Sequence, residues 1–502
     1  MKKMISGLLA LVLGCGIAFG GEVVSEKKVK ELEKMIEDAG IYVETAKKGV
    51  VLSGYVDASY SYNMNGGGTD TGANGTPGPI RTHQFDVDSN DFNVNQVKLA
   101  LEKALPAENT WAAGFRIDLM FGEDAKYLWD NDWGMGDGEL AVEQAYIQFR
   151  VPIGNGLDFK FGKFVSLLGY EVIETPANLN VSRSYWYTYG VPLFHTGFLM
   201  SYKFNDMVDV KLGLVNGWNN SDSNYLDGDI NGENGDQGPA DFAKAITAQI
   251  ALHSASGNAD LVNSFIYSFE GEQAIGQTQT LERWDGDWDG DNIAENAGVF
   301  LWDIWGQWRP LAFKDKLLLA FDAGIGHVYD NHQGDKWTDH SYNIGIDENT
   351  DTWWGFSVYA KYQLTDVVSL ALRGEYFHDG DGTARVQDLA TNYWDNENWS
   401  DNGRGGYNGD AYFVNSTDLW SVTATVGFDL WENMLMRLEY RLDIASSDGG
   451  NAIENGGILA FADDDDDLQP INFGGEDGVE QNVFTNNRST QHTFILDFSY
   501  SF

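Results

Sequence analysis

The chain has 502 residues and a formal net charge of −44, because 76 acidic residues outnumber 32 basic ones. Such a charge argues against nucleic acid as a partner, which requires a positively charged surface. The 17 Trp, 23 Tyr and 28 Phe exclude the aromatic-poor composition of a disordered chain. With 58 Gly and 9 Pro, the composition favours strands joined by turns.

Residues 1–21 have the order of a secretory signal peptide. Lys2 and Lys3 precede an apolar run that extends to Phe19, and small residues follow it. We expect cleavage near Gly20 or Gly21, which would also remove Cys15, the single cysteine of the chain. The mature protein would then have no disulfide and no cysteine metal site. The alternative is a lipoprotein, because the residues before Cys15 faintly resemble a lipoprotein cleavage box.

Residues 22–48 are predicted to form a periplasmic amphipathic helix or linker. Val29, Leu32, Ile36 and Ala39 recur at helical spacing among Lys and Glu residues. The pattern is too short to establish a coiled coil. An oligomerisation element, a plug inside a barrel and a simple linker remain open.

Residues 49–502 predict an all-β fold, a transmembrane antiparallel up-and-down β-barrel of about sixteen strands. The alternating segments lie near 49–63, 92–104, 110–122, 139–151, 156–165, 193–204, 207–218, 242–253, 260–270, 297–309, 316–330, 352–364, 367–378, 416–430, 434–446 and 490–502. Each covers the roughly 9–11 residues that a tilted strand needs to cross a bilayer. Short connections alternate with long ones, as expected for periplasmic turns and outer loops. An even strand number would place both termini in the periplasm.

The last strand is predicted to be a signal for outer-membrane assembly. Phe494, Leu496, Phe498 and Tyr500 alternate with polar or smaller residues, and the chain ends at Phe502. A final strand that ends in Phe resembles the signal recognised by the barrel-assembly machinery of bacteria. The alternative is an edge strand of a soluble sandwich.

Aromatic residues cluster near the ends of the segments. We predict that most form girdles at the two membrane interfaces. The examples are Trp302, Trp305, Trp308, Trp353, Trp354, Trp420 and Trp431. Stacking against sugars is the alternative for those that face a lumen.

One face of each predicted strand is apolar and the other carries charge, so the charged face is predicted to line the lumen. The candidates are Arg116, Asp118, Arg150, Lys160, Arg373, Glu375, Arg437, Glu439, Arg441 and Asp443. Most of the acid excess falls in the predicted outer loops, which would attract cations and repel anions at the mouth. The alternative is loop charge that only keeps the surface hydrated.

The connection at residues 166–192 differs from the other long connections, because it is less acidic and contains apolar residues unusual in a free loop. We predict that it folds into the barrel and narrows the pore. Glu171 and Glu174 would face the passage, and Arg183 would pair with one of them or with the wall.

The same connection resembles a known family. Gly169-Tyr170-Glu171, Asn178, Asn180, Ser182-Arg183-Ser184, Pro192 and His195-Thr196-Gly197 are similar to the signature of the OmpL-like β-barrel porins. The resemblance is specific over this stretch and is of general barrel character over residues 49–502. It implies an outer-membrane barrel and suggests a channel.

Two acidic stretches predict calcium binding in the outer loops. They contain Asp227, Asp229 and Asn231, and Asp285, Asp287, Asp289 and Asp291, in the spacing of the first half of an EF-hand loop. Gly238 and Asn296 stand where such a loop has its glutamate, so a hydrated, turn-rich loop is the alternative. No other cofactor is expected, and the absence of catalytic motifs predicts that the chain is not an enzyme.

The leading hypothesis is an outer-membrane porin with a water-filled channel for passive diffusion of small solutes and ions, with a preference for cations. One alternative is a substrate-selective channel for sugars or peptides. The other is a non-transport surface or structural barrel that acts through calcium-binding loops. The expected partners are outer-membrane lipid, small solutes or cations, and the barrel-assembly machinery. A homotrimer and a monomer both remain open.

Overall fold

The computed structural model describes residues 49–64, 83, 85–86, 89–128, 140–218, 244–268, 298–329, 352–379, 417–447, 461–462, 468–469 and 490–502. Residues 1–48, with the predicted signal peptide and helix, lie outside the described residues, as do both predicted calcium-binding stretches. In the described part of the chain, no helix is long and apolar enough to span a membrane.

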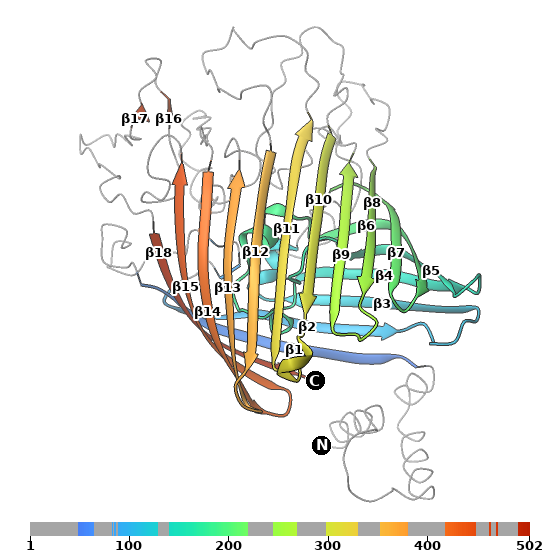
Figure 1. Cartoon of the computed structure of the whole chain (residues 1–502), viewed down its shortest axis with the longest axis horizontal. Coiled ribbons are helices and arrows are strands. Elements are labelled where there is room, and N and C mark those ends of the chain that lie inside the picture. The colour runs from blue at the N-terminus through green and yellow to red at the C-terminus, as the bar shows by residue number, and fades with distance from the viewer. Residues whose placement is uncertain are drawn as a thin grey trace, which may run out of the picture.

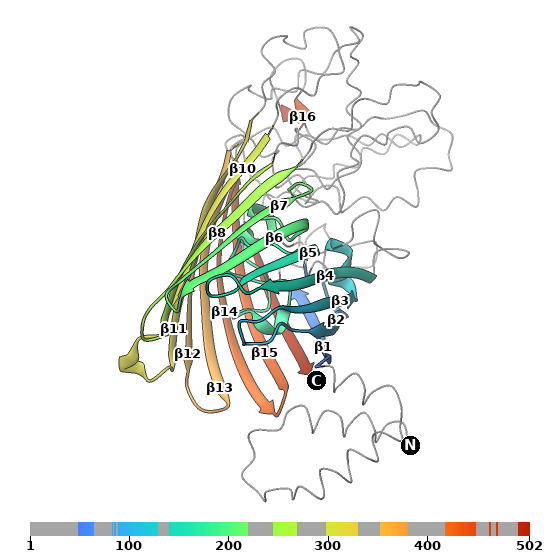
Figure 2. The same cartoon turned by 90° about the vertical axis from the view of Figure 1, so that its right-hand side faces the viewer.

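Sixteen antiparallel strands form one closed barrel (Figures 1 and 2). They are β1 (Val51–Asn63), β2 (Asp91–Lys103), β3 (Ala112–Phe121), β4 (Leu140–Val151), β5 (Leu157–Val165), β6 (Phe194–Asn205), β7 (Val208–Val215), β8 (Ala245–His253), β9 (Ala259–Ser268), β10 (Gly298–Trp308), β11 (Leu317–Tyr329), β12 (Thr352–Gln363), β13 (Val368–Asp379), β14 (Thr417–Trp431), β15 (Met434–Ser447) and β18 (Thr490–Ser501). A separate hairpin of β16 (Phe461–Ala462) and β17 (Leu468–Gln469) lies between β15 and β18 in the sequence. The prediction of an up-and-down barrel of about sixteen strands is confirmed.

The first and last strands close the barrel. β1 pairs with β18 from Tyr55 opposite Ser501 to Asn63 opposite Thr493. Beyond this register, Gly54 and Phe502 exchange two backbone hydrogen bonds of 3.0 and 2.8 Å. Closure leaves no strand of the barrel with an unpaired edge, as a sheet in hydrocarbon requires.

The two faces of the strands differ as the alternation predicts. On β15, Arg437, Glu439 and Arg441 are buried inside, whereas Tyr440 and Ile444 are exposed on the outside. An apolar outer face suits contact with lipid, and the charged side chains must find partners within the barrel. The short turns join β2 to β3, β4 to β5, β6 to β7, β8 to β9, β10 to β11, β12 to β13 and β14 to β15, all at one end of the barrel. We call this the short-turn end.

The aromatic residues at the strand ends divide between the two faces. Trp354, Tyr376 and Trp420 lie side by side on the outside of β12, β13 and β14, with ring centroids 4.9 and 4.3 Å apart. Trp353 is fully buried inside, and Trp305 contacts the inner ring of Tyr170. The girdle prediction is therefore wrong for Trp305 and Trp353, because their register turns them towards the interior.

Candidate functional site

Residues 166–193, between β5 and β6, form a segment that lies inside the barrel (Figures 1 and 2). We call it the lumen segment. It contains two short helices, η2 (Thr175–Ala177) and η3 (Trp186–Gly190). Its own side chains shape it: the Asn178 amide bonds to the N–H and carbonyl of Val172 at 2.9 and 2.7 Å. The Arg183 guanidinium donates to the carbonyls of Val181 and Ile173 at 2.8 and 2.5 Å.

One side of the lumen segment is held by an ion pair to the wall. Glu171 accepts from Arg373 of β13 at 2.9 Å, and its second oxygen accepts from the Ser184 N–H at 2.7 Å. Arg373 also donates to the Ser182 carbonyl at 2.5 Å. Both side chains are almost completely buried. Buried charges are stable only when they are paired and hydrogen-bonded, as these are.

Glu375 and Glu439 bind the backbone of the same stretch. The carboxylate of Glu439 accepts from the N–H groups of Val181 and Ser182 at 2.6 and 2.9 Å, and from the Ser182 hydroxyl. The carboxylate of Glu375 accepts from the Tyr185 N–H at 2.6 Å. These contacts fix the backbone itself, so the position of this stretch does not depend on one side chain.

Arg441 and Asp443 complete this side of the site. Arg441 donates to the Arg183 carbonyl at 2.5 Å and to Asp443 at 2.6 Å. The Tyr185 hydroxyl donates to the same oxygen of Asp443 at 2.6 Å. Arg437, which precedes Arg441 on β15 and lies nearer the short-turn end, donates to Asp497 at 2.8 Å and to the Thr175 carbonyl at 3.0 Å.

The other side of the lumen segment is held by Lys98 of β2. Its ammonium lies 2.8 Å from Glu143 and 3.1 Å from Asp118, and it also pairs with Glu174 of the lumen segment. Asp118, Glu143 and Glu174 are the acidic group in the described chain whose oxygens lie close enough together to hold a metal ion. The ammonium already lies among these oxygens, so the cluster is an ion-pair network.

A third set of contacts comes from β8 to β11. Asp303 accepts from the Gly169 N–H at 3.0 Å and from the Trp186 indole at 2.8 Å. Asp322 accepts from the Tyr170 N–H at 2.8 Å. Gln249 and Ser264 both donate to the Leu167 carbonyl, at 2.7 and 2.9 Å. The lumen segment is thus bonded to strands on opposite sides of the barrel, and it spans the lumen.

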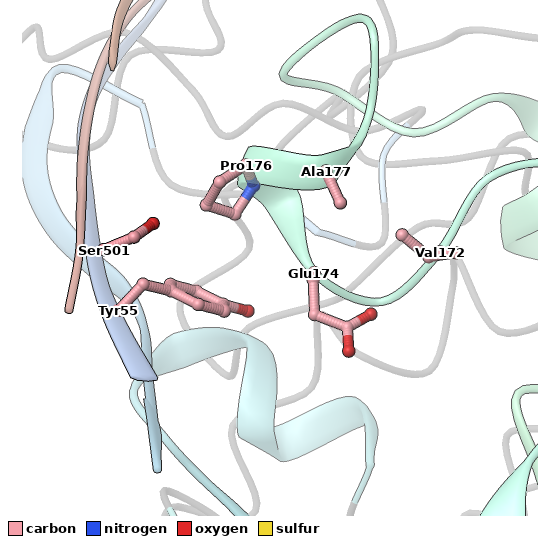
Figure 3. A pocket seen from close by; sticks show the side chains of 6 residues that line it. All are labelled: Tyr55, Val172, Glu174, Pro176, Ala177 and Ser501. Atoms are coloured by element: carbon pink, nitrogen blue, oxygen red, sulfur yellow. The ribbon is translucent and has the colours of Figure 1, made fainter. Parts of the chain in front are cut away.

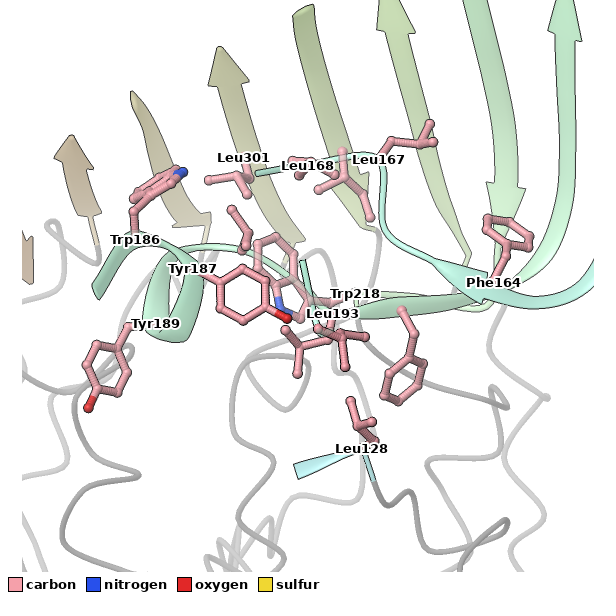
Figure 4. Packing of buried hydrophobic residues seen from close by; sticks show 14 of the residues in the cluster. Leu128, Phe164, Leu167, Leu168, Trp186, Tyr187, Tyr189, Leu193, Trp218 and Leu301 are labelled. Atoms are coloured by element: carbon pink, nitrogen blue, oxygen red, sulfur yellow. The ribbon is translucent and has the colours of Figure 1, made fainter. Parts of the chain in front are cut away.

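A hydrophobic cluster packs between the lumen segment and the wall (Figure 4). Trp186 and Tyr187 of the segment pack in this cluster with Leu301 of β10 and Trp353 of β12. Gly324 leaves the space for Trp186, because a Cβ there would lie 2.2 Å from the indole. Gly326 does the same for Trp353, at 2.0 Å.

A cavity of about 480 Å³ remains beside the lumen segment, next to β1 and the end of β18. Its lining residues are Tyr55, Val172, Glu174, Pro176, Ala177 and Ser501 (Figure 3). The Glu174 side chain is 24 % exposed, whereas that of its partner Lys98 is 4 % exposed. Burial opposes ionisation of Glu174, but the charge of Lys98 outweighs it and holds the pKa of this carboxyl below its usual value. The cavity therefore has a carboxylate at its edge.

The structure places the predicted wall residues on inward faces and pairs most of them locally. Arg116 bonds to Asp118 at 2.9 Å, and Arg150 bonds to Asp158 at 2.6 Å. Lys160 lies over the ring of Tyr146, 4.4 Å from its centroid. Whether these residues act on solutes stays a prediction.

Some residues that hold the lumen segment were not among the sequence candidates. They are Gln96, Glu143, Gln249, Asp303 and Asp322. Asp303 and Asp322 are isolated acidic residues at inward positions of mostly apolar strands. The alternation of each strand could therefore have predicted that they face the lumen. Glu143 lies at a register shift in the β3–β4 pairing. The period of two breaks at such a shift, so it does not predict which way Glu143 faces.

Comparisons with known proteins give one family and a set of distant structures. A search of curated protein sequences found no match. Among solved structures, the outer-membrane channel DcaP of Acinetobacter baumannii has a TM-score of 0.47 and 12 % identity, over 90 % of this chain and 97 % of that chain. An anion-selective porin from Comamonas acidovorans has 0.47 and 9 %, over 90 % and 99 %. OmpT of Vibrio cholerae, in its trimer form, has 0.46 and 10 %, over 90 % and 99 %.

The family comparison covers the whole described barrel. Residues 49–502 match the model described as "Putative beta-barrel porin-2, OmpL-like". Several residues that carried the resemblance in the sequence, including Glu171, Asn178, Ser182 and Arg183, are those that shape the lumen segment or bond it to the wall. The chain therefore belongs to the OmpL-like β-barrel porin family of outer-membrane channels.

Proposed function

We propose that this chain is a passive diffusion channel of the outer membrane that admits small solutes and ions and prefers cations. The observation that carries the proposal is the lumen segment, which is bonded across a closed barrel and leaves an open cavity at Glu174. A fixed segment sets a constant width, so solutes would be sorted by size at this level. As a member of a porin family, the chain is a channel and not an enzyme.

The cation preference is argued from the distribution of charge. Arginines and carboxylates of the wall neutralise one another over short distances, as Arg116 does with Asp118. Residues outside these wall pairs therefore carry most of the net charge of −44. At the segment, Glu174 is the charged residue that lines the cavity. A carboxylate at a narrow, low-dielectric passage favours cations.

Conductance across a planar lipid bilayer tests the proposal. We expect steady openings of purified, folded protein and, under a KCl gradient, a reversal potential displaced towards the potassium equilibrium. Absence of conductance from protein that migrates as a heat-modifiable barrel would contradict the channel. A reversal potential displaced towards chloride would contradict the cation preference alone.

A substrate-selective channel for sugars is the second candidate, and a cluster of inward aromatic rings favours it. Tyr170 of the lumen segment lies 5.6 Å from Trp305 and 5.1 Å from Tyr359, between ring centroids. Aromatic faces are suited to stacking against the apolar faces of sugars. Block of the current by an oligosaccharide, lost on Trp305→Ala, would favour this candidate over general diffusion.

The remaining proposals concern parts outside the described residues or partners. We propose that residues 1–21 are a signal peptide, that residues 22–48 form a periplasmic helix, and that both termini are periplasmic. We also propose that the barrel-assembly machinery binds β18 and that Ca²⁺ binds the stretches 227–231 and 285–291. A homotrimer is the proposed assembly. Proteolysis with and without a chelator tests the calcium proposal, and equal cleavage patterns would contradict it.

A further inference from the structure

We propose that Lys160 of β5 and Lys211 of β7 form a binding site for the carboxylate group of a solute inside the barrel. This inference rests on the proposed channel function. It names the chemical group of a passing solute that the two lysines would bind. In the ring of strands, β5 and β7 lie across the barrel from β13 and β15, which carry Arg373 and Asp443. The ion pairs that hold the lumen segment do not involve β5 or β7.

The two lysines lie on the inward faces of neighbouring strands. The Lys160 ammonium lies over the ring of Tyr146, whose side chain is buried inside the barrel. The Lys211 ammonium donates to Oε1 of the buried Gln249 at 2.8 Å. One strand, β6, separates them: Lys160 is opposite Leu199, and Lys211 is opposite Ser201.

Their charges are not neutralised as those of three inward cations on β2, β3 and β4 are. Lys98, Arg116 and Arg150 each lie within 3.2 Å of at least one carboxylate oxygen. Within the described chain, neither Lys160 nor Lys211 has a carboxylate oxygen within 4.0 Å. Both side chains are partly buried, so water screens them incompletely and their field extends into the lumen.

The geometry suits one carboxylate. Adjacent strands lie about 4.8 Å apart, so β5 and β7 are about 10 Å apart, and two flexible lysine side chains can converge over that distance. Tyr146 and Gln249 orient the two ammonium groups without removing their charge. A carboxylate can accept from both at once, which gives the charge-assisted hydrogen bonds that are stronger than neutral ones.

Two kinds of solute carry this group: a net anion, such as a dicarboxylate, and a zwitterion, such as a short peptide. The acidic charge of the chain repels the first more than the second. Succinate and glycylglycine are therefore the two probes of the experiment.

The experiment measures block of single-channel current by each probe with the full chain, and succinate binding to detergent-solubilised protein by isothermal titration calorimetry. We expect block by at least one probe and heat of binding for succinate. The double variant Lys160→Gln/Lys211→Gln should raise the half-blocking concentration and the Kd at least about tenfold. Lys160→Arg/Lys211→Arg should retain both effects.

Lys316→Gln is the matched control, because Lys316 lies in the exposed turn before β11 and the change removes the same charge. It should leave block and binding unchanged. Heat-modifiable migration on a gel verifies that each variant is folded. Conducting protein that neither probe blocks and that binds no succinate would overturn the site and leave the channel standing. Protein that does not conduct but binds succinate through the two lysines would overturn the channel and leave the site.

Discussion

At the scale of single residues, the charges inside the barrel act in groups. Lys98 is bonded to three carboxylates, and Arg373 is bonded to Glu171 and to two carbonyls of the lumen segment. In a large group of paired charges, the remaining side chains compensate when one is removed. In a small group, the same removal leaves a buried charge without a partner. The position of a charge in its group therefore decides what its substitution does.

Glu174→Gln should reduce the cation preference and leave the barrel folded. Lys98 keeps Asp118 and Glu143 as partners, so the network survives, while the cavity loses its carboxylate. The reversal potential under a KCl gradient measures the change. Glu108→Gln, in the exposed turn between β2 and β3, is the control for loss of one charge. Equal reversal potentials for wild type and Glu174→Gln would contradict this role.

Asp124→Asn should stabilise the protein more at pH 8 than at pH 5. Asp124 lies in η1 (Glu123–Tyr127), where burial raises its pKa to about 6 while Gln96 donates to it at 2.6 Å. A raised pKa means that the folded state binds the proton more tightly, so wild-type stability falls as the pH rises from about 4 through 6. The loss is limited to about 3 kcal/mol, which the amide avoids.

The measurement for Asp124→Asn is the temperature at which the folded, fast-migrating form is lost on a gel, at both pH values. Asp91→Asn serves as the control, because this residue is exposed at the start of β2. A wild-type stability that rises between pH 5 and pH 8 relative to the variant would have the wrong sign.

At the scale of elements, the lumen segment behaves as a part of the wall. Its backbone forms hydrogen bonds with side chains of β2, β8, β9, β10, β11, β13 and β15. Its aromatic rings pack into the inner face through glycines on β11. The passage therefore has a fixed shape for as long as these contacts hold.

Gly324→Ala should loosen the lumen segment. The added Cβ would lie 2.2 Å from the Trp186 ring and 2.5 Å from the Trp302 carbonyl, so the indole has to move. Overpacking of this kind costs about 1–3 kcal/mol. We expect a lower melting temperature together with larger or noisier single-channel conductance. Gly374→Ala is the matched control, since its nearest neighbour would be 3.8 Å away, and it should change neither measurement.

Arg373→Met should destabilise the segment more than any change at the cavity edge. It leaves the buried carboxylate of Glu171 without its guanidinium and leaves Glu375 with Arg441 alone, a loss of about 3–5 kcal/mol. Proteolysis within residues 166–193 should accelerate. Adding Glu171→Gln to this variant should recover part of the loss, and a double variant no more stable than the single one would contradict the pairing.

At the scale of the whole molecule, the barrel depends on closure between its first and last strands, β1 and β18. Gly54→Ala should impair this closure, because a Cβ would lie 2.2 Å from the Lys98 carbonyl and 2.8 Å from the Phe502 ring. We expect a smaller yield of heat-modifiable protein on refolding into detergent. Gly374→Ala is again the control, and equal refolding yields for the two variants would contradict a role of Gly54 at the seam.

The number, order and length of the strands follow from the sequence alone. Alternation with a period of two is a local pattern. It recurs on every strand because one face of a barrel strand meets lipid and the other meets the polar interior. The long, apolar connection after β5 was visible for the same reason, because exposed loops seldom carry such residues. The hairpin of β16 and β17 carried no such signal, since each of its strands has two residues.

The partners within the barrel were decided by the tertiary structure alone. Glu171 and Arg373 are 202 residues apart, and Val181 and Glu439 are 258 apart, so no local pattern joins them. A local pattern shows which residues share a face, and its charges indicate which face is inside. Closure of the barrel decides which of those charges meet, because only the closed ring brings distant strands to opposite sides of one lumen.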